Sequence, residues 1–518
     1  MILHPGIIAA QTPDRAAVLF GDHVLTYGAL DHGSRAIAAM LYGNGIGQGD
    51  VIAMLIGNRP EFFFIAWAAQ RSGLYYLPIP TRLTPAEIAY ILTDSGAKAL
   101  FIDPAYAEIA NSAAAKLNIT RYGIDAPSAP PREPPATEGG DMLYTSGTTG
   151  KPKGVRRPLT GEALGTETKR PGRAKALFGL GSDSVFFSPA PLYHAAPLRF
   201  SMNLLRTGGT VVGMSKFDAA GALALIEKHR VTHSQWVPTM FNRLLALPEA
   251  ERGSFDLSSH HVAIHAGAPC SPDLKRQMIN WWGPILHEYY SGTESVGFTH
   301  ATSAQWLERP GTVGQAHGCV IHILDDEGIP LPAGQVGAVY FEGKAGLAYH
   351  NDPAKTQAAH DARGWATMGD IGYLDEEDYL YLTDRRAFTI ISGGINIYPT
   401  EIEAALSSHP MVRDVAVFGI PDADLGESVC ALIELDASEP GDLALAQELI
   451  DHCITTIAQF KLPRRIAFGS VSRTETGKIA KAVLRDQHKC GTKGFAISPA
   501  RNNDVRTVPL PQKEAHNV

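Results

Sequence analysis

The sequence predicts an α/β protein: a large N-terminal domain of two α/β sheet subdomains plus a small β-barrel-like subdomain, followed by a small mobile α+β C-terminal domain. Short apolar runs alternate with segments whose apolar residues recur at helical spacing, which indicates a mostly parallel sheet covered by helices. At 518 residues the chain exceeds a single core, because domains usually hold about 100–200 residues. From about residue 311 the pattern changes to short strands separated by turn residues.

The first 125 residues carry the first sheet. Its expected strands are the apolar runs 16–20, 51–56 and 99–102. The expected helices are 28–43, 60–72 and 85–96. Residues 125–141 are Pro-rich and lack apolar periodicity, so we interpret them as a linker.

A second α/β block follows the linker. Its expected strands are 185–192, 210–214 and 261–266, and its expected helices are 219–229, 239–247 and 272–282. The β-rich subdomain is expected to include 322–330 and 334–343. Beyond Asp384, the α+β segment has expected helices at 401–408 and 443–457 and strands at 412–420 and 428–435. The predicted domains are therefore 1–384 and 385–486, with 487–518 as a disordered tail.

Composition excludes several classes of protein. The net charge is −8, and no cluster of Lys and Arg offsets it, which argues against a nucleic-acid partner. The N-terminus lacks the pattern of a secretory signal, and no stretch approaches 18 apolar residues, so no transmembrane segment is expected. The five scattered cysteines have no metal-ligand spacing and are interpreted as reduced thiols, which predicts a cytoplasmic protein.

Residues 144–155, YTSGTTGKPKGV, are the most informative run in the chain. Hydroxyl groups, glycines and two lysines supply hydrogen-bond donors and positive charge, and glycines let the backbone approach an anion closely. The run therefore predicts a polyphosphate site. It is not a Walker A loop, because Thr145 stands where the first glycine belongs and Pro152 where Ser or Thr belongs.

Further motifs follow in order: EYYSGTE at 288–294, GWATMGDIGYL at 364–374, DRRAFTIISGGINIYPTEIE at 384–403, and FKLPRRIAF with SRTETGKIAK at 460–481. In the first of these an aromatic ring could stack on adenine, a hydroxyl could bind a phosphate oxygen and a carboxylate could hold magnesium. Together with 144–155, these motifs resemble those of the adenylate-forming superfamily, which includes acyl-CoA synthetases, adenylation domains and luciferases. The resemblance covers about residues 10–486 and is strongest to bacterial acyl-CoA synthetases.

The resemblance implies a role for each matching residue. Catalytic roles fall to Lys478, Thr293, Glu294 and His194, with Glu294 also holding Mg²⁺. Lys478 would bridge the substrate carboxylate and the α-phosphate, and His194 would border the acyl carboxylate. Binding of ATP and coenzyme A is assigned to Thr145, Ser146, Gly147, Thr148, Thr149, Gly150, Lys151, Gly267, Ala268, Tyr290, Asp370, Arg385, Gly393 and Gly394.

The chain departs from the family pattern at two places. Met368 replaces the threonine that usually precedes the Gly-Asp pair, and Ala387 replaces the Lys or Asp of the hinge between the domains. Small residues tolerate hinge rotation, so the motion is expected to survive. Lys481 is the nearest alternative to Lys478 as the catalytic lysine.

The acid is less well specified than the reaction. Amino-acid-activating relatives usually have Phe-Asp where this chain has Tyr193-His194, which argues against an amino-acid substrate. Small residues at 266–268 would leave room for a bulky acid, and the following side chains could line an apolar acyl cavity: Phe200, Met202, Trp236, Val237 and Phe241.

The predicted activity is that of an ATP-dependent acid–thiol ligase, which forms an acyl-CoA from a fatty, aryl or ring-bearing carboxylic acid through an acyl-adenylate. The alternative is a stand-alone enzyme that loads a carrier protein, and a third interpretation is a non-catalytic sensor of the same fold. The expected cofactors are ATP, Mg²⁺ and coenzyme A as cosubstrate. Partners are small molecules only, without nucleic acid, and a homodimer is left open.

Overall fold

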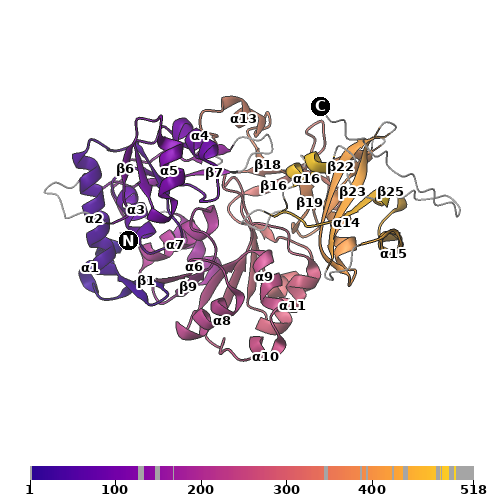
Figure 1. Ribbon diagram of the computed structural model, residues 1–518, viewed down its shortest axis with the longest axis horizontal. Helices are drawn as coiled ribbons and strands as arrows, with labels where there is room; N and C mark the ends of the chain where they lie inside the picture. Colours follow the sequence, from indigo (N-terminus) through magenta and orange to yellow (C-terminus); the bar gives the residue numbers. More distant parts are fainter. Residues whose placement is uncertain are drawn as a thin grey trace, which may run out of the picture. The chain divides into compact units, whose positions relative to one another are not determined.

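The computed structural model describes residues 3–125, 134–145, 152–166, 169–343, 348–385, 388–392, 395–422, 425–435, 441–454, 456–473, 479, 481–488 and 495–496, with backbone alone at 169–171, 384–385, 396, 482 and 495–496. The chain divides into two compact units. The first unit comprises Met1–Ile321 and Phe341–Met368, and the second comprises His322–Tyr340 and Gly369–Val518. Figure 1 labels their helices and strands.

The first unit contains a large sheet with the strand order β15-β14-β13-β12-β11-β9-β10-β1-β2. The strands from β1 through β10, β9, β11 and β12 to β13 run parallel, and antiparallel strands flank them on both sides. The bounds are β1 Ala16–Phe20, β2 His23–Thr26, β9 Val185–Ser188, β10 Thr210–Gly213, β11 His233–Trp236, β12 Val262–His265, β13 Leu286–Tyr290, β14 Thr299–Thr302 and β15 Gln315–Ala316.

A second sheet of the first unit has the order β6-β5-β3-β4-β7-β8. Its strands are parallel up to β7, and β8 then returns antiparallel to β7 as the second arm of a hairpin. The bounds are β3 Val51–Leu55, β4 Tyr75–Pro78, β5 Ala99–Ile102, β6 Thr120–Tyr122, β7 Gly140–Thr145 and β8 Lys153–Arg156.

Helices cover both sheets, as Figure 1 shows for α8 to α11 beneath the large sheet. Local sequence sets their ends: in the helix 85–95, Thr84 and Glu87 form a capping box, Pro85 is the first residue and Gly96 ends the helix at φ 65°. The bounds are α1 Pro5–Gln11, α2 Tyr27–Gly43, α3 Glu61–Gln70, α4 Pro85–Ser95, α5 Ala107–Ala114, α6 Lys169–Phe178, α7 Ala195–Thr207, α8 Ala219–Lys228, α9 Pro238–Leu245, α10 Glu249–Arg252, α11 Pro272–Trp282, α12 Ser303–Glu308 and α13 Pro353–Ala358.

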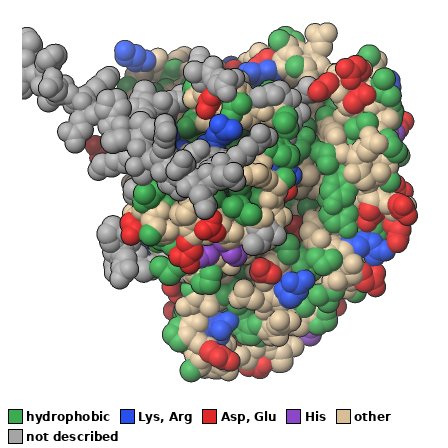
Figure 2. Space-filling view, turned by 90° about the vertical axis from the view of Figure 1, so that its right-hand side faces the viewer, with side chains coloured by type: hydrophobic (Ala, Val, Ile, Leu, Met, Phe, Trp, Pro, Cys, Tyr) green, Lys and Arg blue, Asp and Glu red, His purple; other side chains and the backbone are tan. Residues whose placement is uncertain are grey.

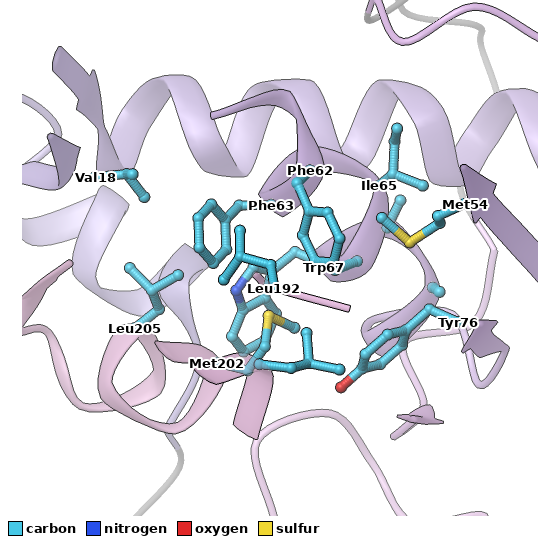
Figure 3. Close-up of a cluster of buried hydrophobic side chains, with 14 of the residues drawn as sticks. Val18, Met54, Phe62, Phe63, Ile65, Trp67, Tyr76, Leu192, Met202 and Leu205 are labelled. Carbon is cyan, nitrogen blue, oxygen red and sulfur yellow. The ribbon is translucent and has the colours of Figure 1, made fainter. Parts of the chain in front are cut away.

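The main core of the first unit joins both sheets through α2, α3 and α7. Figure 3 shows aromatic side chains of α3, including Phe63 and Trp67, close to Met202 and Leu205 of α7. Because each fully buried side chain of this size contributes about 1.5–3 kcal/mol, the cluster holds α7 firmly against the first 80 residues. A separate core on the opposite face of the large sheet is formed with α8, α9 and α11.

The second unit is built from smaller sheets. One has the order β16-β17-β18-β19, and the other has the order β21-β20-β23-β24-β25 with β22 paired to β23. The strands are β16 Val320–Leu324, β17 Gly337–Glu342, β18 Ala366–Leu374, β19 Leu380–Arg385, β20 Ile390–Ser392, β21 Ile395–Ile397, β22 Val412–Asp422, β23 Gly426–Leu435, β24 Arg465–Phe468 and β25 Phe495–Ala496. The helices are α14 Pro399–Ser407, α15 Leu443–Ile454 and α16 Lys481–His488.

The predicted α/β fold class is confirmed, and most predicted elements differ from the observed ones by a few residues at their ends. The tail predicted from residue 487 carries regular structure in part, because α16 extends to His488 and β25 pairs with Arg465 and Ile466 of β24. The rest of that tail lies outside the described residues. The domain boundary at Asp384 stays a prediction.

None of the helices in the described part of the chain is long and apolar enough to cross a bilayer. In Figure 2, Lys and Arg side chains lie dispersed among Asp and Glu on the face that is shown.

Candidate adenylation site

The carboxyl ends of four parallel strands lie at one edge of the large sheet. The strands β9, β11, β12 and β13 are neighbours and point the same way, so the segments that follow them meet at that edge. Ligands of open α/β sheets bind at the carboxyl ends of the strands. Six of the predicted site residues lie in or directly after these strand ends: His194, Gly267, Ala268, Tyr290, Thr293 and Glu294.

The segment after β13 is held in one conformation by local bonds. Ser295 has φ 54°, a left-handed conformation that is uncommon for a residue with a side chain, and its N–H donates to the carbonyl of Gly292 at 3.0 Å. The half-buried Tyr290 packs its ring against Phe341 at 6.1 Å between centroids. This turn places Thr293 and Glu294 immediately beyond the sheet edge.

Arg199, which was not predicted from the sequence, connects this turn to the hairpin formed by β7 and β8. Arg199 of α7 donates through Nη1 to the carbonyl of Thr293 and to Oγ of Ser295, both at 3.1 Å. Its Nη2 lies 2.6 Å from Oδ2 of Asp141 in β7, with both side chains largely buried. The sequence signal that could have revealed this link is an arginine directly after the apolar run 195–198.

The signature run forms the two arms of a hairpin, in which Thr145 at the end of β7 pairs with Lys153 at the start of β8. The hydroxyl of Tyr144 donates to the carboxylate of Asp94 at 2.5 Å. A Cβ at Gly154 would lie 3.0 Å from the ring of Tyr144, so this arm requires a small residue. The hairpin tip, Ser146, Gly147, Thr148, Thr149, Gly150 and Lys151, lies outside the described residues.

The turns after β9 and β12 supply the other edge residues. Gly267 is exposed and has φ 89°, a conformation that favours glycine, and Ala268 follows it. His194 precedes α7 and stands in edge-to-face contact with Tyr193, with 4.7 Å between ring centroids. Gly267, Ala268 and His194 thus lie at the same sheet edge as Glu294.

A second group of predicted residues comes together within the second unit. Asp370 of β18 and Arg385 of β19 are register partners in an antiparallel pair. Asp370 is buried, and Gly369 before it has φ 80°, so β18 requires a glycine at this position.

Several predicted residues lie outside the described part of the chain, namely Lys478, Gly393, Gly394 and the hinge residue Ala387. The alternative lysine is described. Lys481 is buried, forms a 2.9 Å ion pair with Glu403, and lies over the ring of Phe388. Lys481 therefore has a structural role within the second unit.

The side chains proposed for an apolar acyl cavity belong to two different cores. Phe200 and Met202 of α7 pack in the core shared with α2 and α3, whereas Trp236, Val237 and Phe241 pack in the core beneath α8, α9 and α11. Successive strand residues point to opposite faces of a sheet, and α7 and α9 cover opposite faces. The prediction that all five line one cavity is wrong.

A buried ion pair supports the floor of the site. Lys275 of α11 lies 2.7 Å from Oε2 of Glu288 in β13, and Nε2 of His265 in β12 lies 3.7 Å from the same oxygen. Burial raises the pKa of the Glu288 carboxyl, against the opposing effect of Lys275, and burial lowers the pKa of His265. The ion pair joins α11 to β13, beside His265 at the end of β12, which directly precedes Ala266 and Gly267.

The donors at the sheet edge fit magnesium better than a transition metal. Glu294 offers a half-buried carboxylate and Thr293 a hydroxyl, and Mg²⁺ is usually held by one or two carboxylates together with substrate phosphates. Among the residues that the structure describes, no group of three or more His, Cys, Asp or Glu side chains could hold a metal ion. The residues present therefore fit Mg²⁺ that arrives with ATP.

Two family models match the chain. The model described as AMP-binding enzyme matches residues 8–348, and the model described as AMP-binding enzyme C-terminal domain matches residues 401–478. The two matches together span both units.

The chain is similar to proteins that join acids to thiols. It is 32% identical to the long-chain-fatty-acid–CoA ligase FadD13 of Mycobacterium tuberculosis, over 90% of this chain and 93% of that protein. It is also 32% identical to the fatty acid–[acyl-carrier-protein] ligase ScoC of Streptomyces coeruleorubidus, over 92% of this chain and 94% of that protein. The structure of o-succinylbenzoate CoA synthetase (MenE) from Bacillus subtilis with its acyl-adenylate intermediate matches with a TM-score of 0.82 and 28% identity, covering 95% of this chain and 98% of that chain.

Proposed function

The chain belongs to the AMP-binding enzyme family and is an AMP-forming acyl-CoA synthetase that uses ATP and coenzyme A, and from that premise we propose that its acid is apolar: fatty, aryl or ring-bearing. The observation that carries the proposal is the set of residues at the carboxyl edge of the large sheet. His194 stands directly before α7 and follows Tyr193 in the chain. No acidic side chain in the Tyr193-His194 pair is present to hold the ammonium of an amino acid.

An aromatic cluster forms around Phe200 of α7, the helix that His194 precedes. Phe200 lies six residues further along α7, about 9 Å along the axis at 1.5 Å per residue. Its ring lies 5.7 Å from that of Phe178, 5.9 Å from that of Phe186 and 5.9 Å from that of Tyr289. We propose that the half-buried ring of Phe200, supported by these three buried rings, faces the tail of the acid.

The reaction proceeds in two steps. A carboxylate oxygen attacks the α-phosphorus of ATP, pyrophosphate leaves, and an acyl-adenylate forms. The thiol of coenzyme A then attacks the acyl carbon, AMP leaves with the bonding electrons, and the thiol proton is released.

We propose the following roles for this chain's residues. Glu294 and Thr293 hold Mg²⁺ and a phosphate oxygen, Tyr290 stacks on adenine, and the hairpin between Thr145 and Lys153 binds the departing pyrophosphate. Asp370 and Arg385 bind the ribose and the phosphate. Lys478 stabilises the charge that develops during the first step. Mg²⁺, when bound, neutralises phosphate charge.

Transfer to a carrier protein is the second candidate, because the chain is as similar to ScoC as it is to FadD13. The two candidates share the first step and differ only in the thiol. One experiment separates them: incubate the enzyme with ATP, Mg²⁺ and each acid of a panel, then add coenzyme A or a holo-carrier protein. Release of pyrophosphate and AMP with an apolar acid and coenzyme A supports the proposal. Turnover only with amino acids or short polar acids contradicts it, and thioester formation only on the carrier favours the second candidate.

A further inference from the structure

Tyr349 is a residue of the first unit that contacts both the signature hairpin and the turn that carries Glu294. Its hydroxyl donates to Oε1 of Glu294 at 3.1 Å. The Nζ atom of Lys153 lies over its ring, 5.2 Å from the centroid. One side chain thus contacts the proposed magnesium carboxylate and a lysine of the phosphate-binding run.

The backbone around Tyr349 is anchored without help from its hydroxyl. Tyr349 forms an antiparallel bridge with Val155, and its N–H donates to Oγ1 of Thr356 at 3.0 Å. The N–H of His350 donates to the carbonyl of Gly154 at 2.8 Å, and the His350 ring lies 2.9 Å from the carbonyl of Asp94. The ring is therefore held at β8 by main-chain bonds, and the hydroxyl is left to act on Glu294.

The backbone of Glu294 is fixed in a similar way, but its side chain needs a partner. Arg199 bonds to the carbonyl of Thr293 and to Oγ of Ser295, on either side of Glu294. These contacts set the main chain and leave the rotatable bonds of the Glu294 side chain to be fixed by its own hydrogen bonds. Carboxylates that bind metals are commonly oriented by such a partner.

We propose that Tyr349 is a positioning residue for adenylation, which orients the Glu294 carboxylate toward Mg²⁺ and keeps the Lys153 ammonium at the phosphate-binding hairpin. The aromatic face holds the ammonium by a cation–π contact, and the hydroxyl holds the carboxylate. The Lys153 ammonium and the Glu294 carboxylate thus contact different parts of Tyr349, so they are held near the same substrate without pairing with each other. This inference rests on the proposed role of Glu294 as the magnesium carboxylate.

The test uses the full-length enzyme and a titration of Mg²⁺. Pyrophosphate release is measured against Mg²⁺ concentration at saturating ATP and acid, and binding of ATP is measured separately by calorimetry in EDTA. Tyr349→Phe removes only the hydroxyl, so its melting temperature should match wild type. It should raise the half-saturating Mg²⁺ concentration about tenfold. Saturating Mg²⁺ should restore kcat, and binding of Mg²⁺-free ATP should not change.

Two further variants sharpen the result. Tyr349→Leu also removes the ring from Lys153, so it should show the same Mg²⁺ shift and in addition weaken binding of Mg²⁺-free ATP. Tyr381→Phe is the matched control, because the Tyr381 hydroxyl donates to the Asp375 carboxylate at 3.4 Å within the second unit. It should leave both measurements unchanged.

Glu294→Gln separates failure of this inference from failure of the proposed function. If Glu294→Gln raises the Mg²⁺ requirement and Tyr349→Phe does not, the inference about Tyr349 is overturned while the role of Glu294 stands. A loss of kcat in Tyr349→Phe that Mg²⁺ does not restore also overturns it, because a purely structural role would give that result. If Glu294→Gln keeps the wild-type requirement, the assignment of Glu294 is wrong and the inference falls with it.

Discussion

Both Nε and Nη2 of Arg199 donate to Oδ2 of Asp141, at 3.0 and 2.6 Å. Asp141 is the second residue of the strand that ends at Thr145, and Arg199 lies on the helix that begins after His194. Because the third arm of the guanidinium reaches the carbonyl of Thr293, one side chain joins three segments of the proposed site. This link predicts that a change at Arg199, which has no proposed contact with substrate, will disturb catalysis through the segments that it joins.

Replacing Arg199 should therefore reduce both stability and adenylation. Arg199→Ala removes the ion pair with the largely buried Asp141, and breaking a buried pair costs about 3–5 kcal/mol. Arg199→Lys keeps a charge but loses the forked geometry. Urea unfolding and pyrophosphate release measure the two effects, and a drop of roughly 10²-fold in release is expected from displaced groups. The exposed pair of Arg230 with Asp256 provides a control, since Arg230→Ala should change neither measurement.

The two lysines near the end of the second unit should separate catalysis from stability. Lys478→Ala should lower adenylate formation roughly 10²–10³-fold while ATP binding persists. Lys481→Ala should instead destabilise the fold by about 3 kcal/mol, because Glu403 loses the ion pair in a buried site. Pyrophosphate exchange and thermal unfolding of both variants are the measurements. Wild-type adenylation in Lys478→Ala would show that a different residue stabilises the first step.

Glycine at 267 should be required for its backbone conformation rather than for space. A Cβ there would lie 3.7 Å from Val237, an ordinary contact, but the φ of 89° strains any residue with a side chain. Gly267→Ala should cost about 1–2 kcal/mol and slow turnover. Gly43→Ala in the last turn of α2 has open space and a helical setting, so it should stabilise by about 0.5–1 kcal/mol. Equal effects of the two changes would contradict the argument from φ.

Low pH should destabilise the first unit, because this unit contains buried histidines. Burial lowers the pKa of His260 to about 3, that of His300 to about 3 and that of His287 to about 4. The unfolded chain takes up these protons below about pH 6.5, whereas the folded chain does so only near pH 3–4, so stability present at pH 7 is lost as pH falls between those values. Each such histidine adds up to about 1.4 kcal/mol of lost stability per pH unit.

Urea unfolding at pH 7 and pH 5 measures how steeply the free energy of unfolding changes with pH. His260→Gln and His300→Asn should each lower the number of protons taken up on unfolding by up to one. His287 and His300 share a 2.9 Å hydrogen bond, so the effects of changing both are not expected to add. A slope that is the same in wild type and in all variants would place the acid sensitivity elsewhere.

Local patterns predicted the elements well, because helix ends and buried strands are encoded in neighbouring residues. The helix expected at 272–282 is observed as Pro272–Trp282, with Ser271 as its cap. The edge residues of the large sheet were also predictable, because parallel strands bring their carboxyl ends together. Motif resemblance, rather than spacing, is the basis for the roles proposed for them.

Contacts between distant segments were not predictable from the sequence. The bonds of Arg199 to Asp141 and of Tyr349 to Glu294 join residues more than 50 positions apart. The acyl cavity prediction failed for the same reason, since Phe200 and Phe241 look alike in sequence and differ only in which face of the sheet their helices cover. Pairing of Phe495–Ala496 with β24 likewise depends on main-chain bonds that composition does not reveal.

The departure at Met368 limits how this chain can be recombined with its relatives. A Cβ at Gly292 would collide with Sδ of Met368 and lie 2.8 Å from Oε2 of Glu294. A larger residue at 292 could be accommodated only if Met368 or the carboxylate moved, and moving the carboxylate would break its bond to Tyr349. Positions 292 and 368 are therefore coupled: a chimera that brings a residue larger than glycine to position 292 would need a smaller residue, or another rotamer, at position 368.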